Sequence, residues 1–351
     1  MAIHNPYYSH QMHGDFEIAD IGDLVLEDGA TLRGCQVAYQ TLGRLNAAKD
    51  NAVLVTTSYA GNHSVMRDTY VGQGLGIDPA EHYVILVNQI GSGLGTSPHN
   101  LDGPYGRGRF PHVRIGDDVV AQDRLLREHL GVEELALVFG ASMGAQQTYE
   151  WAVRFPDRVK RAAPLAGTAR VCQHCVIRVQ TLVDTLRGDP AWAGGFYERS
   201  SDLRCGLERH AGLYALHGLS NRFWTEERWR PLGYSSPDDF IGWFVAGAFL
   251  PMDPGDLVAQ AWKWQHGDVG RHTGGDLPAA LGRITARTCV MPISSDQFSP
   301  PEDLQRDQVL IADSELRVIE DVHGQVALFG VDPDFLLQVD DVLRSLLGTD
   351  V

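Results

Sequence analysis

The sequence predicts an α/β protein with a mostly parallel central sheet, helices on both faces and an inserted helical lid. From about residue 17 to 167, short apolar or β-branched runs alternate with polar turns and helical patterns, and this alternation returns near the end of the chain. Such alternation is typical of a parallel sheet covered on both faces. Roughly between residues 168 and 285 it disappears. We therefore expect an α/β core formed by residues 1–167 and 286–351, with a helical lid at 168–285.

The expected core elements follow one another as short runs bounded by turn residues. The strands of the first part are "DIGDLVLE" (20–27), "TLRGCQVAYQTLG" (31–43), "AVLVTTSY" (52–59), "HYVILVNQI" (82–90), "LALVFGA" (135–141) and "VKRAAPLAG" (159–167). A helix is expected over residues 117–132, where apolar side chains recur at helical spacing. The second part offers the strands "ITARTCVMPIS" (284–294) and "SELRVIEDV" (314–322) and the helices "PPEDLQRDQVLIA" (300–312) and "DPDFLLQVDDVLRSLLG" (332–348).

The expected lid is rich in aromatic residues. It contains six of the seven tryptophans, together with several phenylalanines. We expect most of these rings to fill the core of the lid itself. A few can instead line an apolar pocket and exclude water from a site beneath the lid, and the pocket candidates are Trp192, Phe244 and Trp243.

Composition and charge restrict the class of partner. The 351 residues carry a formal net charge of −16, which argues against binding to nucleic acid or to an anionic membrane, since both attract clustered Lys and Arg. A small-molecule substrate is favoured. The first twenty residues lack the basic region and apolar core of a signal peptide, and no later run has the length of a membrane span. We expect a cytoplasmic protein.

The cysteines indicate neither a disulfide framework nor a metal site. They number five, spread over a long chain, which favours reduced thiols. Cys172 and Cys175 form one C-x-x-C pair, but no second pair at zinc spacing accompanies them. We therefore predict no metal and no cofactor.

The stretch "LALVFGASMGAQQTYEW" (135–151) carries the strongest functional signal in the sequence. Ser142 lies between Gly140 and Gly144, where an expected strand passes into an expected helix. A nucleophile elbow needs this arrangement, because the sharp turn exposes the serine Oγ and larger neighbouring residues would collide with it. The alternative is a glycine-rich turn whose serine merely caps the helix. We favour the nucleophile.

A serine nucleophile needs a base, and the base needs an acid to orient it. Asp296 lies just beyond the expected strand 284–294, and His323 just beyond the strand 314–322. We predict that His323 accepts the proton of Ser142 and that Asp296 accepts the imidazole N–H. Asp321 and Glu302 are rival acids, less well placed after the penultimate strand.

Two backbone N–H groups are expected to stabilise the oxyanion of the intermediate. One belongs to Met143, which follows the nucleophile at the start of a helix, where peptide dipoles favour negative charge. The other should come from the loop "TTSYAGNH" (56–63), and Tyr59 is the candidate. The glycine-rich run "QIGSGLGTSPHN" (89–100) fits neither phosphate-loop nor dinucleotide spacing.

Several segments together resemble the homoserine O-acetyltransferase family of α/β-hydrolases. The residues that carry the resemblance are "NAVLVTTSYAGNH", "YVILVNQIGSGLGTSP", "FGASMGAQQTYEWAVRFPDRVKRAAPLAGTAR", "DPAW", "FLPMDPGDLVAQAWKWQHGDVG" and the closing Asp and His segments. The resemblance implies an α/β-hydrolase fold with a helical lid, an acyl-enzyme on Ser142 and, in many members, a homodimer.

The chain departs from the family's transferases where these hold their charged substrate. They carry an aspartate directly after the catalytic histidine, whereas Gly324 follows His323 here. They also place an arginine in the first lid helix, where alignment on "DPAW" puts Val183, although Arg170, Arg178 or Arg187 could supply a displaced clamp. Without such a clamp a zwitterion would leave buried charges unpaired.

We therefore predict a serine-dependent hydrolase of a small ester or amide. The first alternative is an acyl-CoA-dependent O-acyltransferase, which shares every catalytic residue and uses an alcohol in place of water. The second is a noncatalytic small-molecule receptor on the same fold, which would be expected to lack a member of the triad.

Overall fold

Residues 2–349, the part of the chain that the computed structural model describes, form one central eight-stranded sheet and a separate two-stranded sheet. The strands of the large sheet lie in the order β1-β4-β6-β5-β7-β8-β9-β10. Their bounds are β1 (Glu17–Asp20), β4 (Gln36–Leu42), β5 (Ala52–Thr56), β6 (Tyr83–Val87), β7 (Leu137–Ala141), β8 (Arg161–Leu165), β9 (Arg287–Val290) and β10 (Ser314–Leu316). The small sheet pairs β2 (Leu24–Val25) with β3 (Thr31–Leu32).

Thirteen α-helices and eight segments of 3-10 or π helix accompany the described strands. The α-helices are α1 (His10–His13), α2 (His63–Tyr70), α3 (Ile115–Arg124), α4 (Met143–Arg154), α5 (Gln173–Arg187), α6 (Arg204–Gly218), α7 (Asn221–Thr225), α8 (Pro237–Phe240), α9 (Ala246–Phe249), α10 (Pro254–Gln265), α11 (Leu277–Leu281), α12 (Pro301–Gln308) and α13 (Pro333–Leu347). The other segments are η1 (Arg107–Arg109), η2 (Leu125–His129), η3 (Pro156–Arg158), η4 (Ala193–Gly195), η5 (Ser200–Leu203), η6 (Ile241–Val245), η7 (Val269–Thr273) and η8 (Gly324–Phe329).

The sheet is parallel from β6 to β10, and β4 alone is reversed, since it pairs antiparallel with both β1 and β6. This confirms the predicted α/β fold with a mostly parallel sheet. Thr56, the last residue of β5, pairs with Gly140 of β7. Because neighbouring parallel strands end at the same edge of a sheet, the loops that follow β5, β7, β8, β9 and β10 emerge together at that edge.

Each face of the sheet is covered by a different pair of helices, as the alternating pattern predicts. On one face Val119 of α3 and Trp151 of α4 pack in a core cluster with Leu54 of β5. On the other face Met66 of α2 and Phe335 of α13 belong to a second cluster that includes the opposite side of the strands. Strands β5 and β7 are buried along their whole length, which explains why they read as continuous apolar runs.

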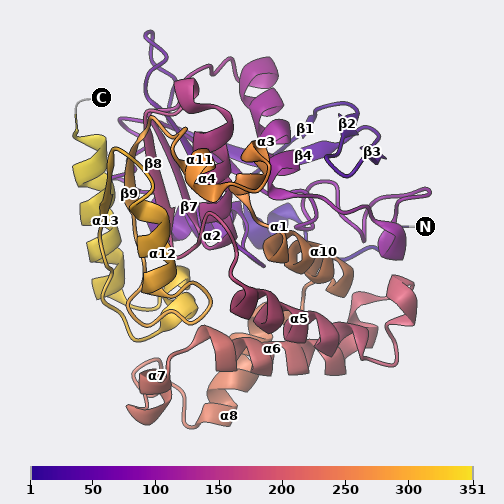
Figure 1. The fold of residues 1–351 in the computed structure, drawn as a ribbon. Helices are drawn as coiled ribbons and strands as arrows, with labels where there is room; N and C mark the ends of the chain where they lie inside the picture. Colours follow the sequence, from indigo (N-terminus) through magenta and orange to yellow (C-terminus); the bar gives the residue numbers. More distant parts are fainter. Residues whose placement is uncertain (1, 350–351) are drawn as a thin grey trace.

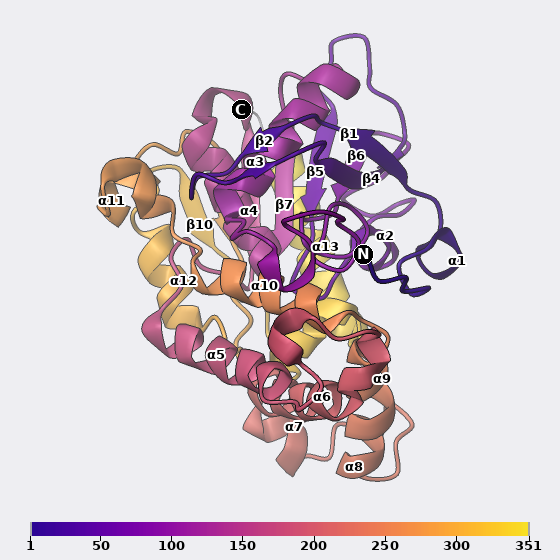
Figure 2. The same cartoon turned by 90° about the vertical axis from the view of Figure 1, so that its right-hand side faces the viewer.

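Helices α5 to α10 form a layer across one end of the sheet, as the two views in Figures 1 and 2 show. This layer has an apolar cluster of its own, to which Val183, Leu207 and Phe240 contribute. The residues that follow α10 return to the α/β core, because Val269 and Leu281 pack in the same cluster as α3 and α4. The helical layer thus ends before the predicted boundary at residue 285. Among the described residues, no helix combines the length and the apolar character needed to cross a membrane.

Candidate active site

Ser142 stands on a strained turn between β7 and α4. Its φ of 56° and ψ of −116° lie outside the regions that L-residues normally occupy, and strain of this kind typically marks functional positions. The flanking glycines are required by space: a Cβ on Gly140 would lie 2.2 Å from the Oγ1 atom of Thr56, and one on Gly144 would lie 2.8 Å from the Thr56 carbonyl oxygen. The predicted elbow geometry is therefore present.

Two free backbone N–H groups lie on the loops that meet at this edge of the sheet. Met143 begins α4, and Tyr59 follows β5. Within residues 2–349 neither N–H group has an acceptor. The Gln89 amide fixes the Tyr59 loop by donating to the carbonyl oxygens of Thr57, at 2.7 Å, and Ser58, at 3.2 Å. Both donors that the sequence predicted for the oxyanion thus remain available to a ligand.

His323 follows β10 and is oriented by Asp321 on the same loop. The Nδ1 atom of His323 lies 3.0 Å from Oδ1 of Asp321, which also accepts the backbone N–H of His323. The Oδ2 atom of Asp332 is 3.8 Å from the same Nδ1 atom, and the ring of Phe223 lies 5.5 Å from the imidazole, centroid to centroid. The imidazole is buried, with 6% of the residue exposed.

The predicted hydrogen bond between Asp296 and His323 is not formed. Asp296 is buried, and its Oδ2 atom accepts a hydrogen bond from Nε2 of Gln325 at 2.6 Å, while Oδ1 accepts one from the backbone N–H of Phe298 at 2.8 Å. Burial raises the pKa of the Asp296 carboxyl to about 7, against the lowering effect of these donors. The predicted Asp296–His323 hydrogen bond is absent because the Nδ1 atom of His323 is already paired with Asp321, which lies only two residues away on the same loop.

Ser142 and His323 are not hydrogen bonded to each other within the described chain. The rival acid Glu302 is exposed at the start of α12. Sequence reasoning missed Gln325, the side chain that Asp296 actually holds. A signal was present, because Gln325 is the single polar side chain in the run "GQVALF" (324–329), directly after the expected base.

An apolar cavity of about 230 Å³ adjoins the Tyr59 loop and the Gln325 loop. Ala60 and Val326, the neighbours of these two residues, lie in its wall, and Phe244 contributes to its lid side. The remaining lining residues are Tyr7, Val65, Tyr214, Val245, Ala248, Phe249, Met252 and Phe329. No charged side chain appears among these residues.

The other two pocket candidates lie elsewhere. The side chain of Trp243 is in solvent, with 77% of the residue exposed, so its prediction as a pocket residue is wrong. Residue 243 lies in η6 between Phe240 and Phe244, whose rings stack inward at 5.2 Å and turn the tryptophan outward. Trp192 lines a different cavity of about 270 Å³, together with Arg107 and several aromatic residues.

Comparisons with known proteins agree with this fold. Residues 51–240 match the family described as the alpha/beta hydrolase fold. The chain is an α/β-hydrolase. It is 49% identical over 345 residues to the ethyl acetate hydrolase of Pseudomonas veronii, covering 98% of this chain and 99% of that one. The structure of an acetylester hydrolase from Corynebacterium glutamicum superposes with a TM-score of 0.98 at 49% identity, over 99% of this chain and 100% of that one.

The resemblance to the transferases is weaker. The homoserine O-acetyltransferase of Thermobifida fusca is 32% identical over 332 residues, covering 86% of each chain. The sequence resemblance thus identified the correct fold family. The relatives at 49% identity carry esterase names, in line with the departures at Val183 and Gly324.

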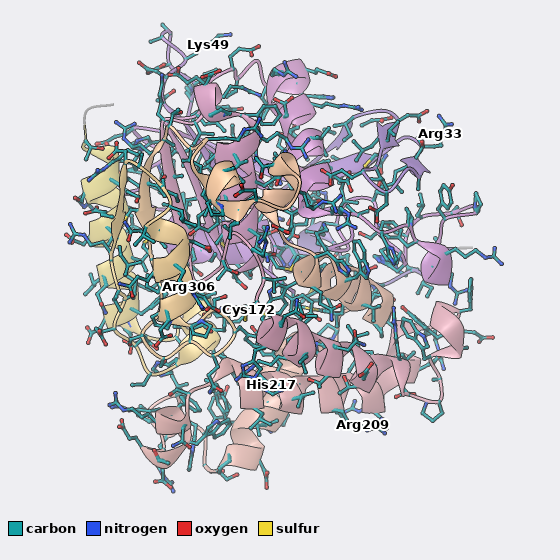
Figure 3. All side chains as sticks on the ribbon, viewed as in Figure 1. Arg33, Lys49, Cys172, Arg209, His217 and Arg306 are labelled. Atoms are coloured by element: carbon teal, nitrogen blue, oxygen red, sulfur yellow. The ribbon has the colours of Figure 1, made fainter. Side chains whose placement is uncertain are left out.

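The cysteine pair of this α/β-hydrolase has a local structural role. Cys172 lies at the start of α5, where the α/β core meets the helical layer (Figure 3). Its sulfur accepts the backbone N–H of Cys175 at 3.4 Å, in the manner of a helix cap, and Cys175 is buried in the core of the helical layer. All five cysteines are free thiols in the structure.

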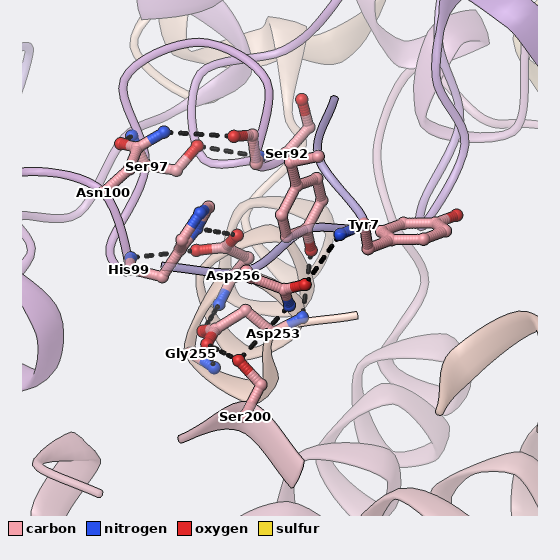
Figure 4. Close-up of polar contacts among 12 residues, drawn as sticks. Tyr7, Ser92, Ser97, His99, Asn100, Ser200, Asp253, Gly255 and Asp256 are labelled. Carbon is pink, nitrogen blue, oxygen red and sulfur yellow. Dashed lines mark hydrogen bonds and ion pairs between the residues drawn. The ribbon is translucent and has the colours of Figure 1, made fainter. Parts of the chain in front are cut away.

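Within the part of the chain that the structure describes, two groups of side chains could each bring three ligand atoms within 4.8 Å of one another: His99, Asp253 and Asp256, and the trio Asp321, His323 and Asp332. The first group is a buried hydrogen-bond network (Figure 4). The Nδ1 atom of His99 lies 2.6 Å from Oδ2 of Asp256, while Asp253 accepts hydrogen bonds from the hydroxyl groups of two lid residues, Tyr197 and Ser200. Since these carboxylates already have protein donors, the network serves to attach the lid segment to α10.

Proposed function

We propose that this α/β-hydrolase hydrolyses small carboxylic esters through an acyl-enzyme on Ser142. The observation that carries the proposal is the strained Ser142 turn together with the free N–H groups of Met143 and Tyr59. The serine Oγ attacks the ester carbonyl, and the two N–H groups stabilise the oxyanion that forms. The alcohol leaves with a proton, and water then attacks the acyl-enzyme and releases the acid.

We assign the proton transfers to His323. The loop that carries it follows β10, at the same sheet edge as the Ser142 turn. Asp321 holds Nδ1 and thereby fixes the tautomer in which Nε2 has the free lone pair. That lone pair accepts the proton of the Ser142 hydroxyl, and the resulting imidazolium gives it to the leaving alcohol. Asp296 has a positioning role, because its hydrogen bond to Gln325 holds the loop that carries His323.

The substrate is proposed to be an acetate ester of a small, uncharged alcohol. The cavity beside Ala60 and Val326 is apolar and about 230 Å³ in volume, which suits a short alkyl group and offers nothing to neutralise a zwitterion. Val183, at the position where the transferases carry an arginine, is buried in the helical layer. The names of the relatives, ethyl acetate hydrolase and acetylester hydrolase, support the same choice.

The test is intact-protein mass after brief exposure to p-nitrophenyl acetate or to acetyl-CoA. We expect one acetyl group on the wild type from the ester, rapid loss of that group in water, and none on Ser142→Ala. Ser201→Ala, a change at an exposed lid serine, is the matched control and should behave as wild type. An adduct from acetyl-CoA that clears only on addition of an alcohol would favour the O-acyltransferase. Absence of labelling and turnover with a series of acyl groups would favour the receptor.

The homodimer implied by the family resemblance and the cytoplasmic location remain predictions. Light scattering of the purified chain tests the first, and fractionation of the source cells tests the second.

A further inference from the structure

The Gln325 side chain connects the buried acid Asp296 to the loop that follows β8. Its Nε2 atom lies 2.6 Å from Oδ2 of Asp296 and 3.0 Å from the carbonyl oxygen of Ala166. The preceding residue, Leu165, accepts the backbone N–H of Ser142 at 2.8 Å. The Gln325 amide therefore contacts Asp296 on one side and, on the other, the residue after β8, the strand whose last residue accepts the backbone N–H of Ser142.

The Gln325 amide cannot act as a general base for Ser142. Its nitrogen has two hydrogens, and the two hydrogen bonds to Asp296 and Ala166 use both of them. An amide nitrogen has no basic lone pair, so it cannot accept the proton of the Ser142 hydroxyl. The hydrogen-bond partner of Asp296 at this position is consequently neutral, and burial raises the pKa of the Asp296 carboxyl to about 7 although its hydrogen-bond donors and the charge of Arg178 lower it.

Asp296 is otherwise equipped to orient an imidazole. Its carboxylate is 4% exposed, Oδ1 is fixed by the Phe298 N–H, and Oδ2 points at residue 325. Gln325 itself is 2% exposed and is the second residue of η8, so the packing around it holds the side chain in place. A histidine has a similar reach, and its two ring nitrogens can donate to an acid and accept from a hydroxyl at the same time.

We propose that residue 325 occupies the general-base position on Asp296, that Gln325 keeps this position without a base, and that Gln325→His alone installs a working Ser142–imidazole–Asp296 relay. This proposal rests on the proposed ester hydrolysis at Ser142. In the variant the Ser142 proton moves to Nε2 of the new imidazole as the Oγ–C bond forms, while Nδ1–H remains bonded to Asp296. The same proton then passes to the alcohol oxygen as the ester C–O bond breaks, so the imidazole is neutral again.

The experiment compares acylation and turnover of p-nitrophenyl acetate in wild type and Gln325→His. We expect kcat/KM to rise by about 10- to 100-fold, within the range of general-base catalysis. Adding Asp296→Asn should remove most of that gain, because the imidazole loses the acid that orients it. Adding His323→Gln should lower the wild-type rate but barely affect the Gln325→His variant. A folded Gln325→His protein that is no faster than wild type, or a gain that survives Asp296→Asn, overturns the proposal.

A second readout does not depend on activity. Proton NMR of Gln325→His should show a new downfield imidazole N–H resonance that Asp296→Asn abolishes, and its absence contradicts the proposed contact. If circular dichroism shows that Gln325→His does not fold, Gln325→Gly with added imidazole replaces it. We then expect an imidazole-dependent rate that saturates and requires Asp296, and no rescue would be the contrary result.

The two proposals fail in different ways. If wild type neither labels nor turns over while Gln325→His does both, the proposed function of the natural chain falls and the assignment of position 325 stands. If wild type hydrolyses the ester and Gln325→His brings no gain in rate, the proposed function stands and the assignment of position 325 is wrong. If neither protein is acylated, both fall.

Discussion

Asp321 and His323 form an acid–imidazole pair within a single turn, with Oδ1 and Nδ1 3.0 Å apart. Because the acid lies two residues from the histidine, the same carboxylate also accepts the His323 backbone N–H. Asp321→Asn keeps the shape of the side chain but allows His323 to adopt the tautomer with the proton on Nε2. We therefore expect kcat for acetate esters to fall by about 10- to 100-fold with little change in KM. The measurement is steady-state hydrolysis of p-nitrophenyl acetate.

Asp332→Asn is the matched control for that change. Its carboxylate is 3.8 Å from the same Nδ1 atom and is partly exposed, with 30% of its side chain accessible. We expect a loss of at most about twofold, since a screened charge at this distance contributes little. Equal losses in the two variants would show that Asp321 has no special role.

Gly140 is the position at which the elbow tolerates no side chain. A Cβ there would lie 2.2 Å from Thr56 Oγ1 and 2.3 Å from the carbonyl oxygen of Gly144, both of them buried. We expect Gly140→Ala to lower the free energy of unfolding by about 3 kcal/mol or more and to abolish activity, because β7 and α4 must separate. Gly212→Ala in α6 is the control, since nothing lies within 4 Å of its Cβ position. Gly212→Ala should raise the free energy of unfolding, measured by urea denaturation, by about 0.5–1 kcal/mol.

Much of this site could be predicted from local sequence. The strand runs and the glycines around Ser142 report steric requirements of a few consecutive residues, and these predictions hold. The partner of His323 could not be read in the same way, because Asp296 and Asp321 both follow parallel strands and the choice depends on side-chain directions in two loops. Trp243 shows the same limit: the face that it presents is decided by the stacking of Phe240 on Phe244.

Lys263 of α10 is buried and is paired with Asp118 of α3. Both side chains are 1% exposed, and the Lys263 ammonium also donates to the carbonyl oxygen of Ile90 at 2.7 Å. Lys263→Met leaves the carboxylate uncompensated, so we expect the free energy of unfolding to fall by about 3–5 kcal/mol. Adding Asp118→Asn should recover more than half of the loss, because the neutral amide oxygen can still accept the Ile90 N–H that Asp118 now accepts at 2.8 Å. Chemical denaturation measures both, and a double variant as unstable as the single one would contradict the argument.

Asp307 gives the stability of the protein a pH dependence. Burial raises the pKa of its carboxyl to about 7, although the Ala169 N–H donates to it at 2.7 Å. Between about pH 4 and 7 the folded state therefore binds a proton that the unfolded state has released, so this group lowers stability as the pH rises. Asp307→Asn removes the cost while its amide oxygen still accepts the Ala169 N–H. We expect Asp307→Asn to raise the free energy of unfolding by about 2–4 kcal/mol at pH 8 and to leave it almost unchanged at pH 4. Thermal unfolding of wild type and Asp307→Asn at pH 4 and pH 8 measures this difference. An equal change in stability at both pH values would show that Asp307 does not titrate between them.

Ala248 offers a test of which cavity receives the substrate. It lines the apolar cavity of about 230 Å³ beside Ala60 and Val326, whereas Ala259 lines the separate cavity of about 270 Å³ that contains Arg107. Ala248→Phe fills part of the first cavity, so we expect kcat/KM for butyl acetate to fall about tenfold or more relative to methyl acetate. Ala259→Phe is the matched control and should leave that ratio unchanged. Should Ala259→Phe alter the ratio and Ala248→Phe not, the ester binds in the cavity with Arg107, and the preference for an uncharged alcohol has to be replaced by one for an anion.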